Sequence, residues 1–342
     1  MAKKALITGI RGQDGAYLSN LLLEKGYEVY GADRRSGESS NWRLKELGIE
    51  KDVNFVYMDI LEFSNIMKIT DKIKPDEIYN LAAQSFVQTS FEQPILTVQV
   101  NAVGVLRLLE AIRSFNPPIK FYQASTSEMF GKAQEIPQTE STPFYPRSPY
   151  AIAKLFGHWI TVNYRESYNM PVCSGILFNH ESPLRGLEFI TRKISYGVAR
   201  IKYGLQDKIV LGNLDAKRDW GYAKEYVEGI WLMLQQETPD NYVLATGETH
   251  SVREFVEKAF EITGYNIIWE GEGINTKGID KKLGKVLVEV SPEFYRLAEV
   301  DVLIGDFIKA REKLGWYPKT KFEGLVKIMV EADIKRIERE YA

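Results

Sequence analysis

The chain has 342 residues, of which 44% are hydrophobic and 26% are charged, and its formal net charge is −2. The length predicts about two domains. The composition predicts a folded core and excludes a disordered chain. The small negative charge excludes a general electrostatic attraction to nucleic acid. The single cysteine, Cys173, excludes an internal disulfide, and no apolar stretch looks long enough to cross a bilayer. We therefore expect a cytoplasmic protein that binds neither nucleic acid nor a membrane.

The first predicted elements are a strand, a glycine-rich turn and a helix. Residues 5–8 form an apolar run with the length of a buried strand, and a helix over 16–23 ends before Gly26. Between them, residues 9–15 read Gly-Ile-Arg-Gly-Gln-Asp-Gly. Glycines in this position let the backbone approach a pyrophosphate, and the amino end of the helix offers unpaired N–H groups. The turn favours a dinucleotide site, with an ordinary glycine-rich turn as the alternative.

Strands and helices then alternate through the first half of the chain. Further strands are expected at residues 28–32, 54–58, 77–81, 120–124 and 172–178. Apolar spacing predicts a helix over residues 102–113, with Asn101 as its cap. Such alternation predicts an α/β fold built on a doubly wound parallel sheet, in which ligands bind at the carboxyl ends of the strands. Segments that contain polar residues follow four of these strands, at residues 59–60, 82–85, 125–128 and 179–182.

The end of the second strand carries a conflict about the cofactor. An acid there usually binds the adenosine ribose and selects NAD, whereas an arginine accommodates the extra phosphate of NADP. In this chain Asp33 is followed at once by Arg34 and Arg35. The two arginines favour NADP, and Asp33 keeps NAD as the alternative.

The most informative pattern is Tyr150-Ala-Ile-Ala-Lys154, which follows the fifth strand. On a helix these two residues share a face, where the lysine ammonium is expected to lower the tyrosine pKa from its usual value of about 10. A phenol tuned in this way can accept the proton of a sugar hydroxyl while a hydride leaves the same carbon. Thr126 could share that hydrogen bond, and Glu128 adds a second base that simple alcohol oxidation does not need. For the Tyr–Lys pair alone, an ordinary amphipathic helix is the alternative.

The second half of the chain is less regular. A polar loop is expected over residues 211–220 and a helix over 223–234, while Ser251-Val-Arg-Glu is a capping box that opens another helix. Arg253 would lie in the first turn of that helix, where a cation opposes the helix dipole, so an anionic ligand would explain it. Guanidinium and ammonium groups suit phosphate oxygens. The cations that could converge on a diphosphate are Lys193, Arg218, Arg253 and Arg296, each with a surface ion pair as the alternative.

Together these motifs resemble the extended short-chain dehydrogenases/reductases, and within them the GDP-mannose 4,6-dehydratase family. The matching segments span nearly the whole chain, at residues 9–15, 80–85, 121–128, 142–151, 175–183, 191–194, 211–221 and 251–256. Three positions depart from the family pattern. Asp33 stands where a lysine or an apolar residue is usual, Leu96 replaces a tyrosine near the cofactor, and Leu297 replaces a proline.

The resemblance implies a lyase that dehydrates GDP-mannose to GDP-4-dehydro-6-deoxymannose with bound NADP. Tyr150 would deprotonate the C4 hydroxyl while a hydride passes from C4 to NADP, and Glu128 would then remove the C5 proton and assist the loss of hydroxide from C6. The hydride would return to C6 and Tyr150 would reprotonate C5, while Lys154 holds the nicotinamide ribose. The alternatives are a 4-epimerase, which needs no base at residue 128, a GDP-4-keto-6-deoxymannose reductase or a chain that does both steps, and a non-catalytic NADP-binding protein.

The resemblance also implies a division of the remaining site residues. Those expected on the cofactor side are Gly9, Arg11, Gly12, Gln13, Asp14, Gly15, Arg34, Arg35, Asp59, Ile60, Leu81, Ala82, Ala83, Gln84, Ser85, Lys154, His180 and Arg185. Those expected on the GDP-sugar side are Ser85, Asn179, Lys193, Leu211, Gly212, Arg218, Arg253, Arg296 and Glu299. We expect no metal ion in the site, and we expect the protein to form a homodimer or a homotetramer.

Two regions are predicted from the same observations. Residues 1–178 would form the dinucleotide-binding Rossmann domain, to which residues 214–247 return. Residues 179–213 and 248–342 would form a smaller α/β region that binds the nucleotide sugar.

Overall fold

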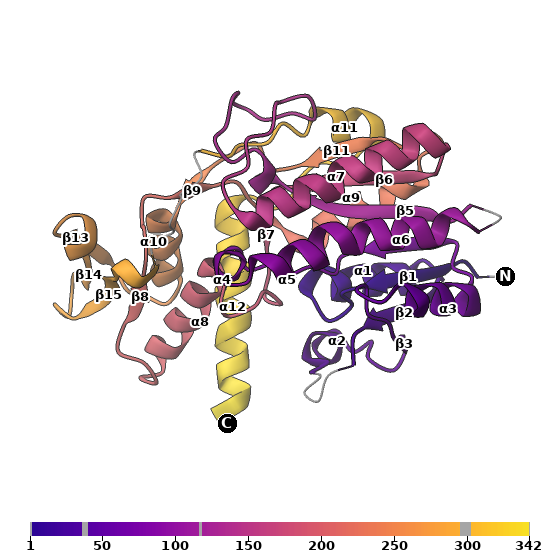
Figure 1. The fold of residues 1–342 in the computed structure, drawn as a ribbon. Helices are drawn as coiled ribbons and strands as arrows, with labels where there is room; N and C mark the ends of the chain where they lie inside the picture. The colour runs from indigo at the N-terminus through magenta and orange to yellow at the C-terminus, as the bar shows by residue number, and fades with distance from the viewer. Residues whose placement is uncertain (1, 36–39, 116–117, 295–301, 342) are drawn as a thin grey trace.

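The computed structural model describes residues 2–35, 40–115, 118–294 and 302–341. Its centre is a seven-stranded sheet with the order β11-β6-β5-β4-β1-β2-β3 (Figure 1), in which every neighbouring pair is parallel. The strands are β1 (Lys4–Thr8), β2 (Glu28–Asp33), β3 (Asn54–Tyr57), β4 (Glu77–Asn80), β5 (Lys120–Thr126), β6 (Val172–Leu177) and β11 (Asn241–Leu244). The order runs outward in both directions from β1, which confirms the predicted doubly wound sheet.

Helices cover both faces of this sheet, because its strands are buried on both sides. Side chains alternate across β1, so that Ala5 and Ile7 pack under one helix layer and Leu6 under the other. The first layer includes α1 (Gln13–Glu24) and α9 (Ala223–Gln235), and the second includes α3 (Phe63–Ile73), α6 (Gly104–Arg113) and α7 (Pro149–Tyr168). Both layers leave open the carboxyl edge of the sheet, where the predicted polar segments lie.

The helix before β5 differs from its prediction in two ways. It begins with α5 (Pro94–Val98) and runs through a π-helical turn, η1 (Gln99–Val103), into α6, so Asn101 lies inside the helix and does not cap it. The whole stretch, Pro94–Arg113, is long and apolar enough to cross a membrane by length and composition, contrary to the expectation that no such stretch exists. Half of its apolar window is buried inside the protein, and it packs against α3 and α7 as a core helix does.

The remaining chain forms a smaller α/β region beside the sheet (Figure 1). Its four-stranded sheet has the order β13 (Ile267–Glu270), β14 (Lys277–Asp280), β15 (Val286–Val290) and β8 (Ile209–Leu211). Its main helices are α8 (Ile190–Lys202), α10 (Val252–Ile262) and α12 (Phe322–Tyr341). The predicted capping box is present, since Ser251 accepts from the backbone of Glu254 and Glu254 accepts from the backbone of Ser251. The expected smaller C-terminal region is thereby confirmed, and its exact bounds stay a prediction.

The other elements of the described chain are short. They are α2 (Trp42–Glu46), α4 (Val87–Glu92), η2 (Ser127–Met129), β7 (Asn179–Glu181), β9 (Lys217–Arg218), β10 (Trp220–Tyr222), β12 (His250–Ser251), η3 (Gly273–Asn275), η4 (Pro292–Phe294) and α11 (Ile308–Leu314). Pairing of β7 with β10 and of β9 with β12 replaces the single polar loop expected over residues 211–220. These short pairs carry two of the predicted sugar-side residues, Asn179 and Arg218.

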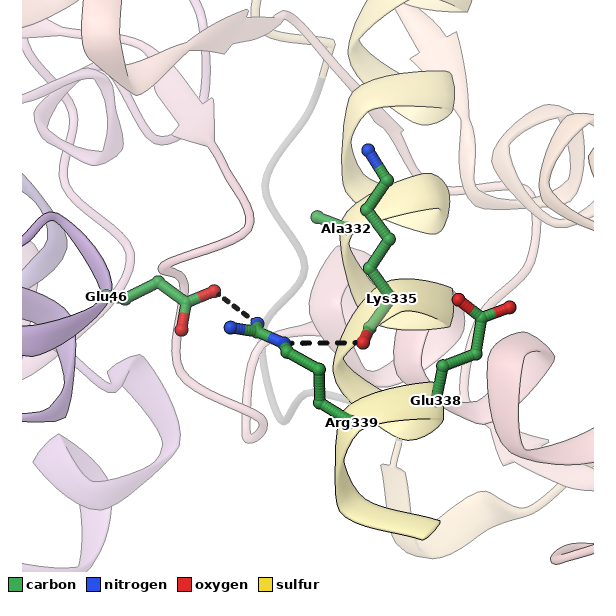
Figure 2. A pocket seen from close by; sticks show the side chains of 5 residues that line it. All are labelled: Glu46, Ala332, Lys335, Glu338 and Arg339. Atoms are coloured by element: carbon green, nitrogen blue, oxygen red, sulfur yellow. Dashed lines mark hydrogen bonds and ion pairs between the residues drawn. The ribbon is translucent and has the colours of Figure 1, made fainter. Parts of the chain in front are cut away.

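The C-terminal helix α12 is tied to both regions by charged side chains. Glu46 of α2 accepts hydrogen bonds from Arg339, at 2.9 Å, and from Arg336, at 3.3 Å. A pocket of about 580 Å³ lies at this junction. Its lining side chains, Glu46, Ala332, Lys335, Glu338 and Arg339, are drawn in Figure 2. Arg192 of α8 pairs with Asp333 at 2.7 Å, and both are almost completely buried. Helix α12 therefore links α8 to α2.

Candidate active site

The glycine turn after β1 forms a cradle that no larger side chain would fit. A Cβ added at Gly9 would lie 2.8 Å from the backbone nitrogen of Ala82, and one at Gly15 would lie 2.6 Å from the Gly9 carbonyl oxygen. Gly9 also has a φ of +72°, which favours glycine. Gly12 caps α1 without a side-chain hydrogen bond, so the first N–H groups of the helix can receive an anion. This cradle fits the pyrophosphate of a dinucleotide.

A pocket of about 500 Å³ lies at the carboxyl ends of β2 and β3. It is lined by Arg34, Arg35, Tyr57, Met58, Asp59 and Asn65, so it brings together three residues that the sequence assigned to the cofactor. The Arg35 guanidinium lies 5.7 Å from the ring centroid of Tyr57. Asn65 holds Asp59 in place by accepting from its backbone N–H at 2.9 Å. Sequence reasoning missed Asn65, because it lies on α3 and no local pattern singles it out.

The segment after β4 is held against the cradle by hydrogen bonds. Thr8 accepts from the backbone N–H of Ala82 at 3.1 Å. Asn101 makes two bonds to the backbone of Gln84, accepting from its N–H at 2.9 Å and donating to its carbonyl at 2.8 Å. The π-helical turn thus carries a side chain that fixes residues 82–85, four of the residues predicted on the cofactor side.

Helix α7 begins in a way that sets Tyr150 and Lys154 at the end of β5. Ser148 accepts from the backbone N–H of Ala151 at 3.1 Å, and Pro149 fills the first helical position. Tyr150 and Lys154 are consequently one helical turn apart and both buried. The Lys154 ammonium donates to the carbonyl of Ala124 on β5 at 2.9 Å and lies 5.9 Å from the Tyr150 ring centroid.

Thr126 and Glu128 complete this cluster from the end of β5. Thr126 hydrogen-bonds to the Tyr150 phenol and accepts from the backbone N–H of Glu128 at 3.2 Å. Glu128 is buried, and its charge acts on Tyr150. The structure therefore brings together all four residues that the sequence predicted as catalytic: Thr126, Glu128, Tyr150 and Lys154.

The electrostatics of the cluster differ from the sequence expectation. Burial raises the pKa of Tyr150 to about 12 and the Glu128 charge adds to the rise, while the Thr126 hydrogen bond and the Arg185 charge lower it. Burial also lowers the pKa of Lys154 to about 8, opposed by the charge of Asp14. The expected lowering of the Tyr150 pKa by Lys154 is therefore wrong for this state, because the ammonium is bonded to Ala124 and desolvation dominates.

A partly buried ion pair between His180 and Asp14 lies beside this cluster. The His180 ring donates through Nε2 to Asp14 at 2.9 Å and through Nδ1 to the Phe178 carbonyl at 2.8 Å, and it stacks on Tyr226. Because both ring nitrogens face acceptors, the geometry calls for the imidazolium form. Burial alone would lower the pKa of His180, but Asp14 outweighs burial and raises it. Burial would likewise raise the pKa of Asp14, and His180 reverses this and lowers it.

Two further observations show which cradle atoms are open to a ligand. The second carboxylate oxygen of Asp14, Oδ1, is buried and has no hydrogen-bond partner within the described part of the chain, as expected of a group that binds a ligand donor. The Gln13 side chain, in contrast, donates to the His180 carbonyl and accepts from Ser182, each at 2.8 Å. Gln13 therefore has only its backbone to offer. Arg185 is paired with Glu181 at 3.2 Å.

The predicted sugar-side cations have partners that the sequence did not reveal. Arg253 donates to Asp215 at 3.0 Å and lies 4.6 Å from the Trp269 ring centroid, so the surface ion pair given as its alternative is present. The Lys193 ammonium lies 3.6 Å from the ring centroid of Phe294. The backbone carbonyl of Phe294 in turn lies against Gly212. Asp215, Trp269 and Phe294 are far from these cations in the sequence, and no motif points to them.

The other sugar-side residues fall on short strands or outside the described residues. Asn179 begins β7, Leu211 ends β8, and Arg218 is buried on β9 opposite His250. Arg296, Leu297 and Glu299 lie outside the described residues. Convergence of the cations on one diphosphate stays a prediction.

Comparison with known proteins agrees with this arrangement. A family model described as GDP-mannose 4,6 dehydratase matches residues 6–329. The GDP-mannose 4,6 dehydratase of Cricetulus griseus is 54% identical over 341 residues, covering 97% of this chain and 92% of that protein. The enzyme of the same name from Sinorhizobium fredii is 54% identical over 339 residues and covers 97% of both chains.

Solved structures show the same fold. The UDP-glucose 4-epimerase of Thermus thermophilus, in complex with NAD, is 25% identical, with a TM-score of 0.79 over 96% of this chain and 98% of that one. The family model covers most of the chain, and the relatives match it over nearly its full length. The chain therefore belongs to the GDP-mannose 4,6-dehydratase family, as the resemblance of its motifs predicted.

Proposed function

We propose that this protein is a lyase that dehydrates GDP-mannose to GDP-4-dehydro-6-deoxymannose. The observation that carries the proposal is the presence of two buried bases, Glu128 directly after β5 and Tyr150 at the start of α7, close enough for the Glu128 charge to act on Tyr150. Removal of a hydroxyl proton and removal of a carbon-bound proton are separate tasks, and an elimination needs both. Simple oxidation or 4-epimerisation needs only the first. The family supports GDP-mannose as the substrate.

NADP is the cofactor we propose for this reaction. The cradle of Gly9, Gly12 and Gly15 would hold its pyrophosphate, and Arg34 and Arg35 would hold its 2′-phosphate. Residues 81–85, Asp14, Lys154, His180 and Arg185 are proposed around the ribose and nicotinamide. When bound, the nicotinamide supplies reversible hydride chemistry, taking a hydride from C4 of the sugar and giving it to C6.

The protein's own residues would move the protons. Tyr150, through its hydrogen bond to Thr126, would accept the proton of the C4 hydroxyl as C4 is oxidised. The resulting ketone acidifies C5, and Glu128 would take the C5 proton and donate a proton to the hydroxide that leaves C6 as water. Tyr150 would then return its proton to C5. Each proton and the hydride that are taken up are given back by the end, so the net change is the loss of one water molecule from the sugar.

The remaining sugar-side residues are proposed to hold the nucleotide. Lys193, Arg218 and Arg253 would neutralise the diphosphate, and Asn179 would lie near the sugar because β7 follows β6 directly. The pair between Arg253 and Asp215 is partly exposed, with Asp215 76% accessible, so a diphosphate could replace the carboxylate at small cost.

Product analysis tests the dehydratase against the reductase and bifunctional alternatives. Purified protein is incubated with GDP-mannose and a trace of NADP⁺, with and without added NADPH, and products are identified by mass. We expect a product lighter by one water in both reactions, with no consumption of NADPH. Further reduction in the NADPH reaction would show the bifunctional alternative, and an unchanged mass would contradict the dehydratase.

A homo-oligomer is proposed as well, and a cytoplasmic location stays a prediction from composition. Adjacent helices α5 and α7 share an exposed apolar face, formed by Ile95, Leu96, Val98, Ile152, Phe156 and Trp159. A contiguous face of this kind suits a second copy of the same chain. Light scattering of Trp159→Lys would show a shift toward monomer, and an unchanged mass would exclude this face from the interface.

A further inference from the structure

The carboxylate of Asp33 is engaged on both oxygens. One oxygen, Oδ2, pairs with the Arg11 guanidinium at 2.5 Å, and the other, Oδ1, accepts from the backbone N–H of Arg34 at 2.8 Å. An acid at the end of the second strand selects NAD by accepting from the ribose 2′-hydroxyl, and its negative charge repels a 2′-phosphate. Asp33 therefore stands at the NAD-selecting position with one hydrogen bond already on each oxygen and with its charge paired to Arg11.

Arg11 is held in this position from several sides. Its Nε donates to the Asn41 side chain at 2.8 Å, and its guanidinium lies 5.9 Å from the ring centroid of Phe55. Its backbone carbonyl accepts from Arg43 at 2.8 Å. The side chains of Arg11 and Asp33 are only 19% and 27% exposed. The pair is thus preformed and partly shielded from solvent, unlike a mobile surface ion pair.

Unlike Arg11, the side chains of Arg34 and Arg35 make no ion pair with a carboxylate in the described part of the chain. Both line the pocket at the ends of β2 and β3. The Arg35 guanidinium lies over the ring of Tyr57, which lines the same pocket, so the Arg35 charge is at the pocket wall. The pocket therefore presents two uncompensated positive charges beside a carboxylate that is neutralised by a third arginine.

We propose that Arg11 determines cofactor specificity by neutralising Asp33, an inference that rests on the proposed NADP-dependent function. The ion pair withdraws Asp33 from the ribose and cancels its repulsion of a 2′-phosphate, so that Arg34 and Arg35 can bind that phosphate. Arg11 acts through Asp33 and is a positioning residue, although it lies in the glycine turn where a pyrophosphate ligand would be expected. Without Arg11 the same Asp33 would repel the phosphate and accept from an unmodified ribose.

Calorimetric titration with NADP⁺ and NAD⁺ tests this without relying on catalysis. The proteins compared are wild type, Arg11→Gln, Asp33→Asn and the double variant. We expect wild type to prefer NADP⁺. Arg11→Gln should weaken NADP⁺ binding by about tenfold or more, the scale of a lost charge-assisted interaction, while NAD⁺ binding holds or improves. Asp33→Asn alone should change NADP⁺ binding little, and the double variant should recover most of the lost NADP⁺ affinity.

The outcomes separate this inference from the proposed function. If wild type prefers NAD⁺, the proposed cofactor itself is wrong. If wild type prefers NADP⁺ but Arg11→Gln weakens both cofactors equally, Arg11 binds the pyrophosphate directly and the inference is overturned. Failure of Asp33→Asn to restore NADP⁺ binding in the double variant would overturn it too. Thermal unfolding of each variant identifies any loss that comes from misfolding, and the double variant, which has no buried unpaired charge at this pair, serves as the folded reference.

Discussion

Glu128 is the residue that distinguishes elimination from the other reactions open to this site. Replacing Glu128 with glutamine removes the proposed base for the C5 proton but leaves Tyr150 and Lys154 in place. With GDP-mannose and NADP⁺, this variant should accumulate bound NADPH, seen by absorbance. Its formation of 6-deoxy product should fall by about 10²–10⁴-fold, the usual effect of losing a general base. Product formation near the wild-type rate would exclude Glu128 from the elimination.

Tyr150 should act one step earlier. Tyr150→Phe keeps the buried ring and removes the phenol, so the C4 hydroxyl loses its proton acceptor and oxidation itself should stop. We expect neither NADPH absorbance nor product, in contrast to the Glu128 variant. Tyr145→Phe is the matched control, since Tyr145 is exposed and its substitution should change neither signal. Substrate oxidation by Tyr150→Phe at a rate near wild type would show that another group is the base.

At the scale of the element, the π-helical turn is coupled to the cofactor segment through Asn101. Asn101→Ala removes both bonds to the Gln84 backbone and leaves buried groups unpaired, at a cost of about 1–3 kcal/mol per group. We expect lower stability in urea unfolding and weaker NADP⁺ binding, because residues 82–85 lose their support. Asn163→Ala, at an exposed position on α7, is the control. Equal behaviour of the two variants would show that Asn101 does not position this segment.

The elements show which features a sequence can predict. The sequence predicts six of the seven strands of the main sheet to within about two residues, because burial on both faces produces short, continuous apolar runs. It does not predict β11, nor the start of the helix at Pro94, and it predicts Asn101 as a cap because nothing local shows its partner Gln84, 17 residues away. The partner of Arg253 is equally hidden in the sequence, because Asp215 lies 38 residues away. Local spacing predicts where a side chain lies, whereas its partner depends on packing.

At the scale of the whole molecule, His158 should make stability depend on pH. It lies buried between α7 and the sheet, 3.0 Å from the Ser174 hydroxyl, and burial lowers its pKa to about 4 from the usual 6.5. The unfolded chain therefore binds more protons in this window, so stability should be fully present above about pH 6.5 and fall as the pH drops toward 4. His180 has a raised pKa and contributes in the opposite sense, with stability present below pH 6.5 and lost as the pH rises through its folded pKa.

Urea unfolding at a series of pH values measures this effect. His158→Gln should remove part of the stability loss between about pH 6.5 and 4, because glutamine takes up no proton. His250→Gln is the control, since His250 is only half buried on β12. If His158→Gln and wild type lose stability equally over this range, His158 does not account for the acid sensitivity.

Most of the site was predictable from the sequence because its residues follow strand ends, and a doubly wound sheet gathers these at one edge. The charge states of the site residues cannot be predicted from the sequence. The pKa of Tyr150 depends on its burial and on Glu128, and the pairing of Arg11 with Asp33 joins residues 22 positions apart. Such properties arise only when the whole molecule is folded.

In the proposed reaction, an oxidation and a reduction take place within one sugar molecule, and isotope transfer from C4 to C6 tests this most directly. GDP-mannose carrying deuterium at C4 is converted by the enzyme with bound NADP in ordinary water, and the product is analysed by mass spectrometry and NMR. We expect a product lighter by one water, with the deuterium in the C6 methyl group and no net formation of NADPH. Deuterium retained at C4 in a product of unchanged mass, or lost to free cofactor, would contradict it.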